Sequence, residues 1–167
     1  TRTSLGEKVG VTYPVYWSEG DKISANGVES SEALIDENNP SRAQFSFPSV
    51  VNYPLNILYP LGAKVLFPAE QSYVEGSFAE GSAPMCGYVA SADEAITMRH
   101  LAGVLRFAIR GEKGVVAALK SVTITASKAL AGEFMVDCKN GTISPTSNSS
   151  TSIVLTLPAN FMLSADK

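Results

Sequence analysis

The chain has 167 residues, 45% of them hydrophobic, which is enough for one domain with a sizeable core and too much for a disordered protein. Its 13 Lys and Arg residues against 16 Asp and Glu residues give a net charge of −3, and no segment gathers the basic residues into a stripe, so we expect no nucleic-acid partner. No apolar run approaches the roughly 18 residues that span a bilayer, and the first residues lack the pattern of a signal peptide, so we expect a soluble mature chain or an excised part of one.

Apolar and polar residues alternate with a period of two along most of the chain, which is typical of half-buried β-strands. The alternating apolar sets are, in chain order, Val11, Tyr13, Val15 and Trp17; Ala43, Phe45 and Phe47; Val65 and Phe67; Leu105, Phe107 and Ile109; Val122 and Ile124; Phe134, Val136 and Cys138; and Ile153, Leu155 and Leu157. The 20 Ser and 10 Thr residues also favour strands, and more weakly an exported protein. Pro14 cannot donate to a strand ladder, so the first strand is expected at a sheet edge.

Turn signals separate these strands. Residues 18–21 lead from the first alternating set into residues 22–26, which predicts a hairpin. Further turns and loops are predicted at Asn26-Gly27, residues 30–40, residues 111–114, Asn140-Gly141 and a flexible loop over residues 144–152. The one predicted helix covers residues 92–99 and is too short to stand without tertiary support.

Many short strands joined by such turns predict an all-β domain, either a two-sheet sandwich or a barrel, over residues 1–167. We expect the large side chains on the apolar faces of these strands to form its core. The core residues that we expect are Trp17, Phe45, Phe107 and Phe134.

The residues needed for most catalytic sites are missing. The single histidine, His100, lies beside Arg99 just before a predicted strand, and the sequence contains no GxSxG, GxGxxG or GxxxxGK[ST] motif. The acidic residues of the 30–40 loop region, Glu29, Glu32, Asp36 and Glu37, do not have the spacing of a calcium loop and are interpreted as solvated. We therefore predict no catalytic residues, no metal site and no cofactor, and expect the protein not to be an enzyme.

The two cysteines, Cys86 and Cys138, are too few for a disulfide framework and do not form a CxxC motif. If the protein is exported, the two can pair. The strand pattern favours the alternative, in which both are buried free thiols that are dispensable for function, because Cys138 continues the apolar face of Phe134 and Val136.

Aromatic residues suggest a second type of function. Trp17, Tyr53, Tyr59 and Tyr73 can in principle form a platform on which sugar rings stack. Trp17 is better explained by core packing, whereas Tyr53 and Tyr59 each precede a proline and are expected in exposed, extended connections. Tyr53 and Tyr59 are therefore the candidate ligand contacts of a glycan- or protein-binding module.

Taken in order, seven segments of the chain resemble the N-terminal half of fimbrillin-like proteins of Bacteroidales. These segments are TRTSL; YWSEGDKISANG; AQFSF; YPLNILYP; LFPAEQSY with the following GSFAEGSAPMCGYVA; HLAGVLRFAIRG; and SVTITASKALAGEFMVD. Each motif alone is weak, but seven in the right order and spacing are specific, and together they cover nearly the whole chain.

The resemblance implies a transthyretin-like β-sandwich of about seven main strands with Greek-key connections, in an exported lipoprotein of the outer membrane. Members of this family are stalk, anchor or tip subunits of fimbriae (pili) or related surface proteins, so the implied partners are other fimbrial subunits and possible host proteins or glycans. In that family an Arg-directed protease can remove the first strand, and a strand from a neighbouring subunit then fills the vacated groove. Arg2 is the residue here that corresponds to such a processing site.

Two departures limit what is carried over. The cysteine that bears the lipid is not in this chain, so the membrane attachment of the family is implied only through an anchor outside it. Family members also continue into a second β-sandwich whose last strand is the donor, so we expect this chain to be the N-terminal domain of a longer protein rather than a short member, and to be monomeric by itself. The alternative function is a stand-alone surface module that binds a glycan or a protein.

Overall fold

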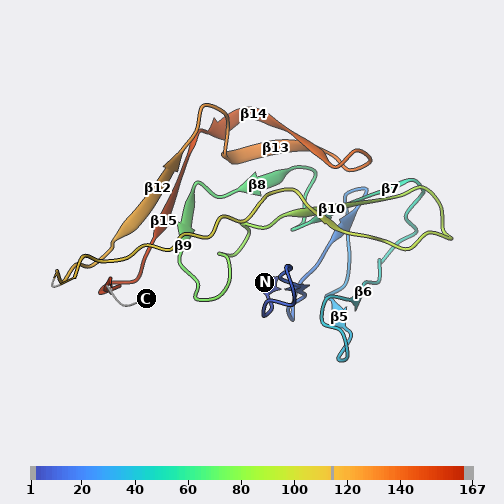
Figure 1. Cartoon of the computed structure of the whole chain (residues 1–167). Coiled ribbons are helices and arrows are strands. Elements are labelled where there is room, and N and C mark those ends of the chain that lie inside the picture. Colours follow the sequence, from blue (N-terminus) through green and yellow to red (C-terminus); the bar gives the residue numbers. More distant parts are fainter. Residues whose placement is uncertain (1–2, 114, 164–167) are drawn as a thin grey trace.

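Every regular element that the structure describes is a β-strand. The structure is a computed structural model that describes residues 3–113 and 115–163, and within these ranges it contains fifteen strands in five sheets and no helix (Figure 1). The all-β class predicted from the alternation is therefore confirmed, and the arrangement is consistent with a β-sandwich.

A five-stranded antiparallel sheet forms the centre of the molecule. Its strands, in spatial order, are β11 (Arg99–His100), β10 (Met85–Val89), β7 (Leu55–Tyr59), β3 (Ser24–Ala25) and β4 (Val28–Glu29). The two longest of them, β7 and β10, pair along their whole length, with Ile57 opposite Gly87 and Leu58 opposite Cys86. Most of their residues are buried, so these two strands organise the core.

Two three-stranded sheets follow one another along the chain. One has the order β14 (Thr142–Ser150), β13 (Ala131–Asp137), β8 (Val65–Phe67), and the other has the order β12 (Ser121–Thr125), β15 (Ser152–Thr156), β9 (Glu70–Ser72). Only Pro68 and Ala69 separate β8 from β9, and only Thr151 separates β14 from β15, so the chain passes twice directly from one sheet to the other. Figure 1 shows β12 and β15 extending to the left, away from the central sheet.

Two small two-stranded sheets complete the fold. The strands β1 (Ser4–Leu5) and β2 (Val15–Tyr16) pair with each other, as do β5 (Leu34–Ile35) and β6 (Ala43–Gln44). Neither pair joins a larger sheet within the described residues, so the N-terminal strand is at an edge, as the position of Pro14 predicts.

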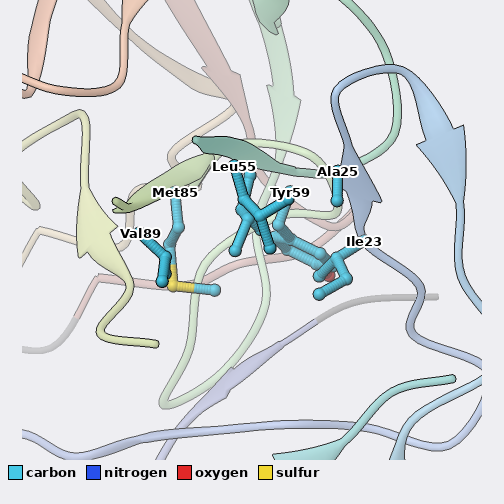
Figure 2. Close-up of a cluster of buried hydrophobic side chains, with 7 residues drawn as sticks. Ile23, Ala25, Leu55, Tyr59, Met85 and Val89 are labelled. Carbon is cyan, nitrogen blue, oxygen red and sulfur yellow. The ribbon is translucent and has the colours of Figure 1, made fainter. Parts of the chain in front are cut away.

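The central sheet has a hydrophobic cluster on each face, because successive side chains of β7 point in opposite directions. The first core consists of Ile23, Ala25, Leu55, Ile57, Tyr59, Met85 and Val89 (Figure 2), covered by Trp17, Phe45, Phe47, Val51 and Met98. The second core consists of Leu58, Val65, Phe67, Cys86, Phe134 and Cys138. This second core packs the central sheet against β8 and β13.

Four of the predicted strands are present, namely β8, β12, β13 and β15. β8 and β12 contain their whole predicted apolar sets, whereas β13 ends one residue before Cys138 and β15 ends one residue before Leu157. Phe134 is buried with 4% of its surface exposed, which confirms its predicted place in the core. The Asn26-Gly27 signal also marks a real hairpin, between β3 and β4, in which both residues have positive φ values of 50° and 83°.

Phe107 was expected in the core, and this prediction is wrong. No strand covers Leu105, Phe107 and Ile109, and the Phe107 side chain is 52% exposed. The alternation is real, but within the described residues no neighbouring strand lies beside this segment to pair with it. Burial of an alternating segment requires such a partner, and the local pattern does not specify one.

The N-terminal strand is shorter than predicted. Val11 is 91% exposed and β2 contains only two residues, so the predicted apolar face over residues 11–17 does not form. The predicted hairpin with residues 22–26 is also wrong, since β2 pairs with β1 and β3 pairs with β4 and β7. Trp17 and Phe45 are half-buried and pack edge to face at 5.1 Å against the first core.

Neither the predicted helix nor the predicted flexible loop is present. The first is a turn that leads into a strand, and the second is mostly a strand. Residues 92–99 contain a turn stabilised by Glu94, whose carboxylate accepts a hydrogen bond from the Ala90 N–H, and then lead into β11. The polar stretch 144–152 is mostly β14, which pairs with β13. An edge strand with solvent on its outer side can be polar, so its composition resembles that of a loop.

Candidate functional site

The most unusual surface of the molecule is an extended apolar segment, residues 103–113, which we call the exposed segment. Its large apolar side chains lie in solvent, with exposed fractions of 61% for Val104, 69% for Leu105, 52% for Phe107 and 44% for Ile109. Soluble monomers rarely expose so many contiguous apolar groups without a function. Arg106 and Arg110 alternate with them, so the segment has the pattern of a strand without the pairing.

Most of the backbone of the exposed segment makes no backbone hydrogen bond among the described residues. Within the described part of the chain, no backbone–backbone hydrogen bond reaches residues 103–111. Figure 1 shows this yellow to gold stretch running as a single ribbon from the central region to the far end of β12. Pairing resumes beyond it, where Leu163 donates to the Ala117 carbonyl and Leu119 donates to the Phe161 carbonyl. The segment therefore presents unpaired backbone donors and acceptors between two fixed ends.

The tip of the β1–β2 hairpin also carries exposed apolar side chains. Val9 and Val11 are 68% and 91% exposed around the turn at Gly10, whose φ is 60°. The Arg106 guanidinium donates a 3.1 Å hydrogen bond to the Tyr13 hydroxyl, which connects the exposed segment to this hairpin. The alternation predicts a buried face for residues 11–17 and for Leu105, Phe107 and Ile109, because alternation alone does not distinguish a paired strand from an unpaired one.

The start of the described chain is held by a buried polar network. The Thr3 N–H donates to the Tyr59 hydroxyl at 3.0 Å, and that hydroxyl donates to the Asp21 carboxylate at 2.8 Å. Asp21 is fully buried and also accepts from the Ser18 N–H at 2.7 Å. The predicted processing residue, Arg2, lies outside the described residues.

The predicted aromatic platform does not form. Tyr59 is only 5% exposed, so the expectation that it contacts a ligand is wrong, because its hydroxyl is needed inside the protein by Thr3 and Asp21. Trp17 packs edge to face against Tyr59 at 5.4 Å and thus belongs to the core wall. Tyr53 remains 46% exposed beside its cis peptide bond with Pro54 and is the one candidate ligand contact that is accessible.

Two shallow hollows lie elsewhere on the described surface. The first, of about 480 Å³, is lined by Gly20, Lys22, Glu29, Glu32, Tyr59, Pro60 and Leu61, and its charges are partly neutralised by a 2.8 Å ion pair between Lys22 and Glu29. The second, of about 410 Å³, is lined by Ala118, Leu119, Lys120, Thr156, Leu157, Pro158, Ala159 and Asn160.

His100 lies on the edge strand β11, opposite Met85, and partial desolvation lowers its pKa. No cluster of three potential metal ligands occurs among residues 3–113 and 115–163. In the same ranges, no helix has the length and apolar character to cross a bilayer.

Comparison with known proteins identifies no relative of this chain. No family model matches the chain, and no curated protein or solved structure is significantly similar to it.

Proposed function

We propose that this chain is a structural or adhesive subunit of a cell-surface fimbria and that its subunits join by β-strand addition. This is the role of the fimbrillin-like proteins that its sequence resembles. The proposal includes their transthyretin-like sandwich, export to the outer membrane, attachment through a lipid anchor outside this chain, and other fimbrial subunits as partners.

The exposed segment is the observation that supports this proposal best. An added strand needs a row of free backbone donors and acceptors for affinity and alternating side chains for register. Residues 103–111 offer both, with Leu105, Phe107 and Ile109 on one side and Arg106 and Arg110 on the other. A strand from a neighbouring subunit can pair there without breaking any backbone hydrogen bond in the described chain.

The alternative, a stand-alone module that binds a glycan or a host protein, has less support. Of its two candidate contacts, Tyr59 is buried and only Tyr53 remains accessible. A single accessible tyrosine does not make a platform for sugar rings.

A proline at position 108 tests strand addition. Ala108→Pro removes a backbone N–H that makes no backbone hydrogen bond in the described chain, so the subunit should fold normally and lose assembly. Electron microscopy of cells that produce this variant should find at least tenfold fewer filaments than on wild-type cells. Val50→Asp, at an 88% exposed position outside the segment, is the matched control and should leave the filaments intact.

Two results would contradict the proposal. Normal filaments with Ala108→Pro would exclude the exposed segment as the joint between subunits. An absence of filaments on wild-type cells, together with tight binding of the purified protein to a glycan or host protein that Tyr53→Ala removes, would favour the stand-alone module.

A further inference from the structure

The second core contains two thiols that come from facing sheets. Cys86 belongs to β10 of the central sheet and is fully buried. Cys138 directly follows β13 and is only 4% exposed. Both are members of the same cluster of buried side chains, although they are far apart in the sequence.

Hydrogen bonding places the Cys138 thiol over the centre of the β7–β10 ladder. Its Sγ lies 3.7 Å from the carbonyl oxygen of Ile57 on β7. Ile57 is opposite Gly87, the residue next to Cys86, and Cys86 is opposite Leu58. Leu58 and Cys86 both contribute to the second core, so the Cys86 side chain points to the face on which Cys138 sits.

A second contact holds Cys138 in this position. Cys138 lies in a turn that is closed by the Gly141 N–H donating to the Asp137 carbonyl at 2.8 Å. A Cβ atom at Gly141 would lie 3.4 Å from Nη1 of Arg99, so the turn packs against that side chain. Arg99 is on β11 and is the ladder partner of Cys86. The turn with one cysteine therefore rests on the strand that neighbours the other.

The electrostatic behaviour of the thiols agrees with this proximity. Burial, together with the charge and hydrogen bond of the neighbouring Cys86, raises the pKa of Cys138 to about 11. Burial also raises the pKa of Cys86, against the influence of Arg99. Both thiols are protonated and shielded in the folded protein, so oxidation is expected while the chain folds and the thiols are accessible.

We propose that Cys86 and Cys138 are a disulfide-forming pair that joins the central sheet covalently to the β8–β13–β14 sheet. The oxidant is a small-molecule or protein disulfide. One cysteine thiolate attacks that disulfide, forming a mixed disulfide and releasing one thiol; the second cysteine then attacks the mixed disulfide and releases the other. The two protons of the cysteines end on the two thiols released. Formation in the cell rests on the proposed export, because exported proteins meet oxidising conditions.

This bond has a structural consequence for the exposed segment. The loop that it closes, from residue 86 to residue 138, contains the whole segment. A partner strand that pulls on residues 103–113 would then load a covalent link between two sheets rather than the apolar contacts of the second core. The bond also restricts the unfolded chain, which stabilises the folded state.

The test uses the wild-type chain in glutathione buffers. The reduced protein is unfolded in urea and refolded in a mixture of reduced and oxidised glutathione. Acid then stops thiol–disulfide exchange, and the protein is digested with trypsin. Cleavage after Lys64, Arg99, Lys128 and Lys139 predicts a linked pair of peptides, 65–99 with 129–139, with a mass two hydrogens below their sum. At equal glutathione composition, the ratio of disulfide to dithiol should be about 30- to 1000-fold higher in native buffer than in urea.

A variant without the two cysteines separates the effect of the disulfide on stability from other effects of the reducing agent. Reduction should lower the Tm of the wild-type protein by about 5–10 °C and leave that of Cys86→Ala/Cys138→Ala unchanged. The proposal would be overturned if the ratio of disulfide to dithiol were no higher in native buffer than in urea. It would also be overturned if both cysteines carried mixed glutathione disulfides and no linked peptides were found. Neither measurement depends on filaments, so failure of the pairing is distinguishable from failure of the proposed fimbrial role.

Discussion

Tyr59 connects three parts of the molecule through one hydroxyl group. Its ring belongs to the first core, and its oxygen accepts from the Thr3 N–H and donates to Asp21. A buried carboxylate is tolerated only when its oxygens have donors, and Asp21 has Ser18 and Tyr59. The first described residue is thus fixed by a contact more than fifty residues away in the sequence, which no local pattern predicts.

Removal of this hydroxyl should destabilise the fold. Tyr59→Phe leaves the buried Thr3 N–H and one Asp21 oxygen without partners, so the free energy of unfolding should fall by about 1–3 kcal/mol. Urea denaturation measures this loss, and hydrogen exchange should be faster at Thr3. Tyr53→Phe is the control, because Tyr53 is 46% exposed, and it should change stability by less than about 0.5 kcal/mol. Equal effects of the two substitutions would exclude the buried network.

The same residue makes stability depend on alkaline pH. Burial, with the hydrogen bond to Asp21, raises the pKa of Tyr59 above its ordinary value near 10. The unfolded chain therefore ionises first, so this contribution is complete below about pH 10 and is lost as pH rises above it. Urea titrations at pH 9 to 11 should find a steeper decline for the wild-type protein than for Tyr59→Phe.

At the level of elements, the sequence predicts strands with one apolar face and fails for other kinds. β12 and β13 alternate because one face of each is half-buried or buried and the other meets solvent. β7 and β10 are buried on both faces, so their sequences LNILY and MCGYV lack alternation and were not assigned as strands. β14 is a polar edge strand and was interpreted as a loop. The central sheet was thus missed because pairing between distant residues, rather than local pattern, defines it.

Gly132 is the element-level feature that can be tested most directly. It lies at the irregularity in the β13–β14 ladder with a φ of 95°, and a Cβ atom there would collide with the backbone of Asn148. Gly132→Ala should therefore lower the free energy of unfolding by at least about 2 kcal/mol. Gly103→Ala is the control, because a Cβ at Gly103 has open space and no positive φ, and it should be neutral. A neutral Gly132→Ala would mean that β14 does not pair in this register.

For the whole molecule, the candidate site depends on what the alternating segment pairs with. The sequence identified Leu105, Phe107 and Ile109 as a strand face and assigned them to the core of the same chain. The structure leaves them exposed, between β11 and the 117–119 region that pairs with 161–163. The sequence pattern therefore predicts a strand face, but whether a strand of the same chain covers that face depends on the three-dimensional arrangement, and among the described residues no strand does.

Phe107 and Phe134 allow a test of whether the exposed segment joins subunits, as proposed. Phe134 is 4% exposed and packs edge to face against Phe67 at 5.2 Å, so Phe134→Ala should cost about 3–5 kcal/mol at any protein concentration. Phe107→Ala should cost less than about 0.5 kcal/mol in dilute monomer, because its side chain is exposed.

If subunits add strands at the exposed segment, the Tm of the wild-type assembly should rise with protein concentration, since a partner that binds only the folded state stabilises it. Phe107→Ala should weaken that rise and Val50→Ala should not. A loss from Phe107→Ala in dilute monomer as large as that from Phe134→Ala would show instead that residues 103–113 pair within their own chain, and the joint between subunits would then lie elsewhere.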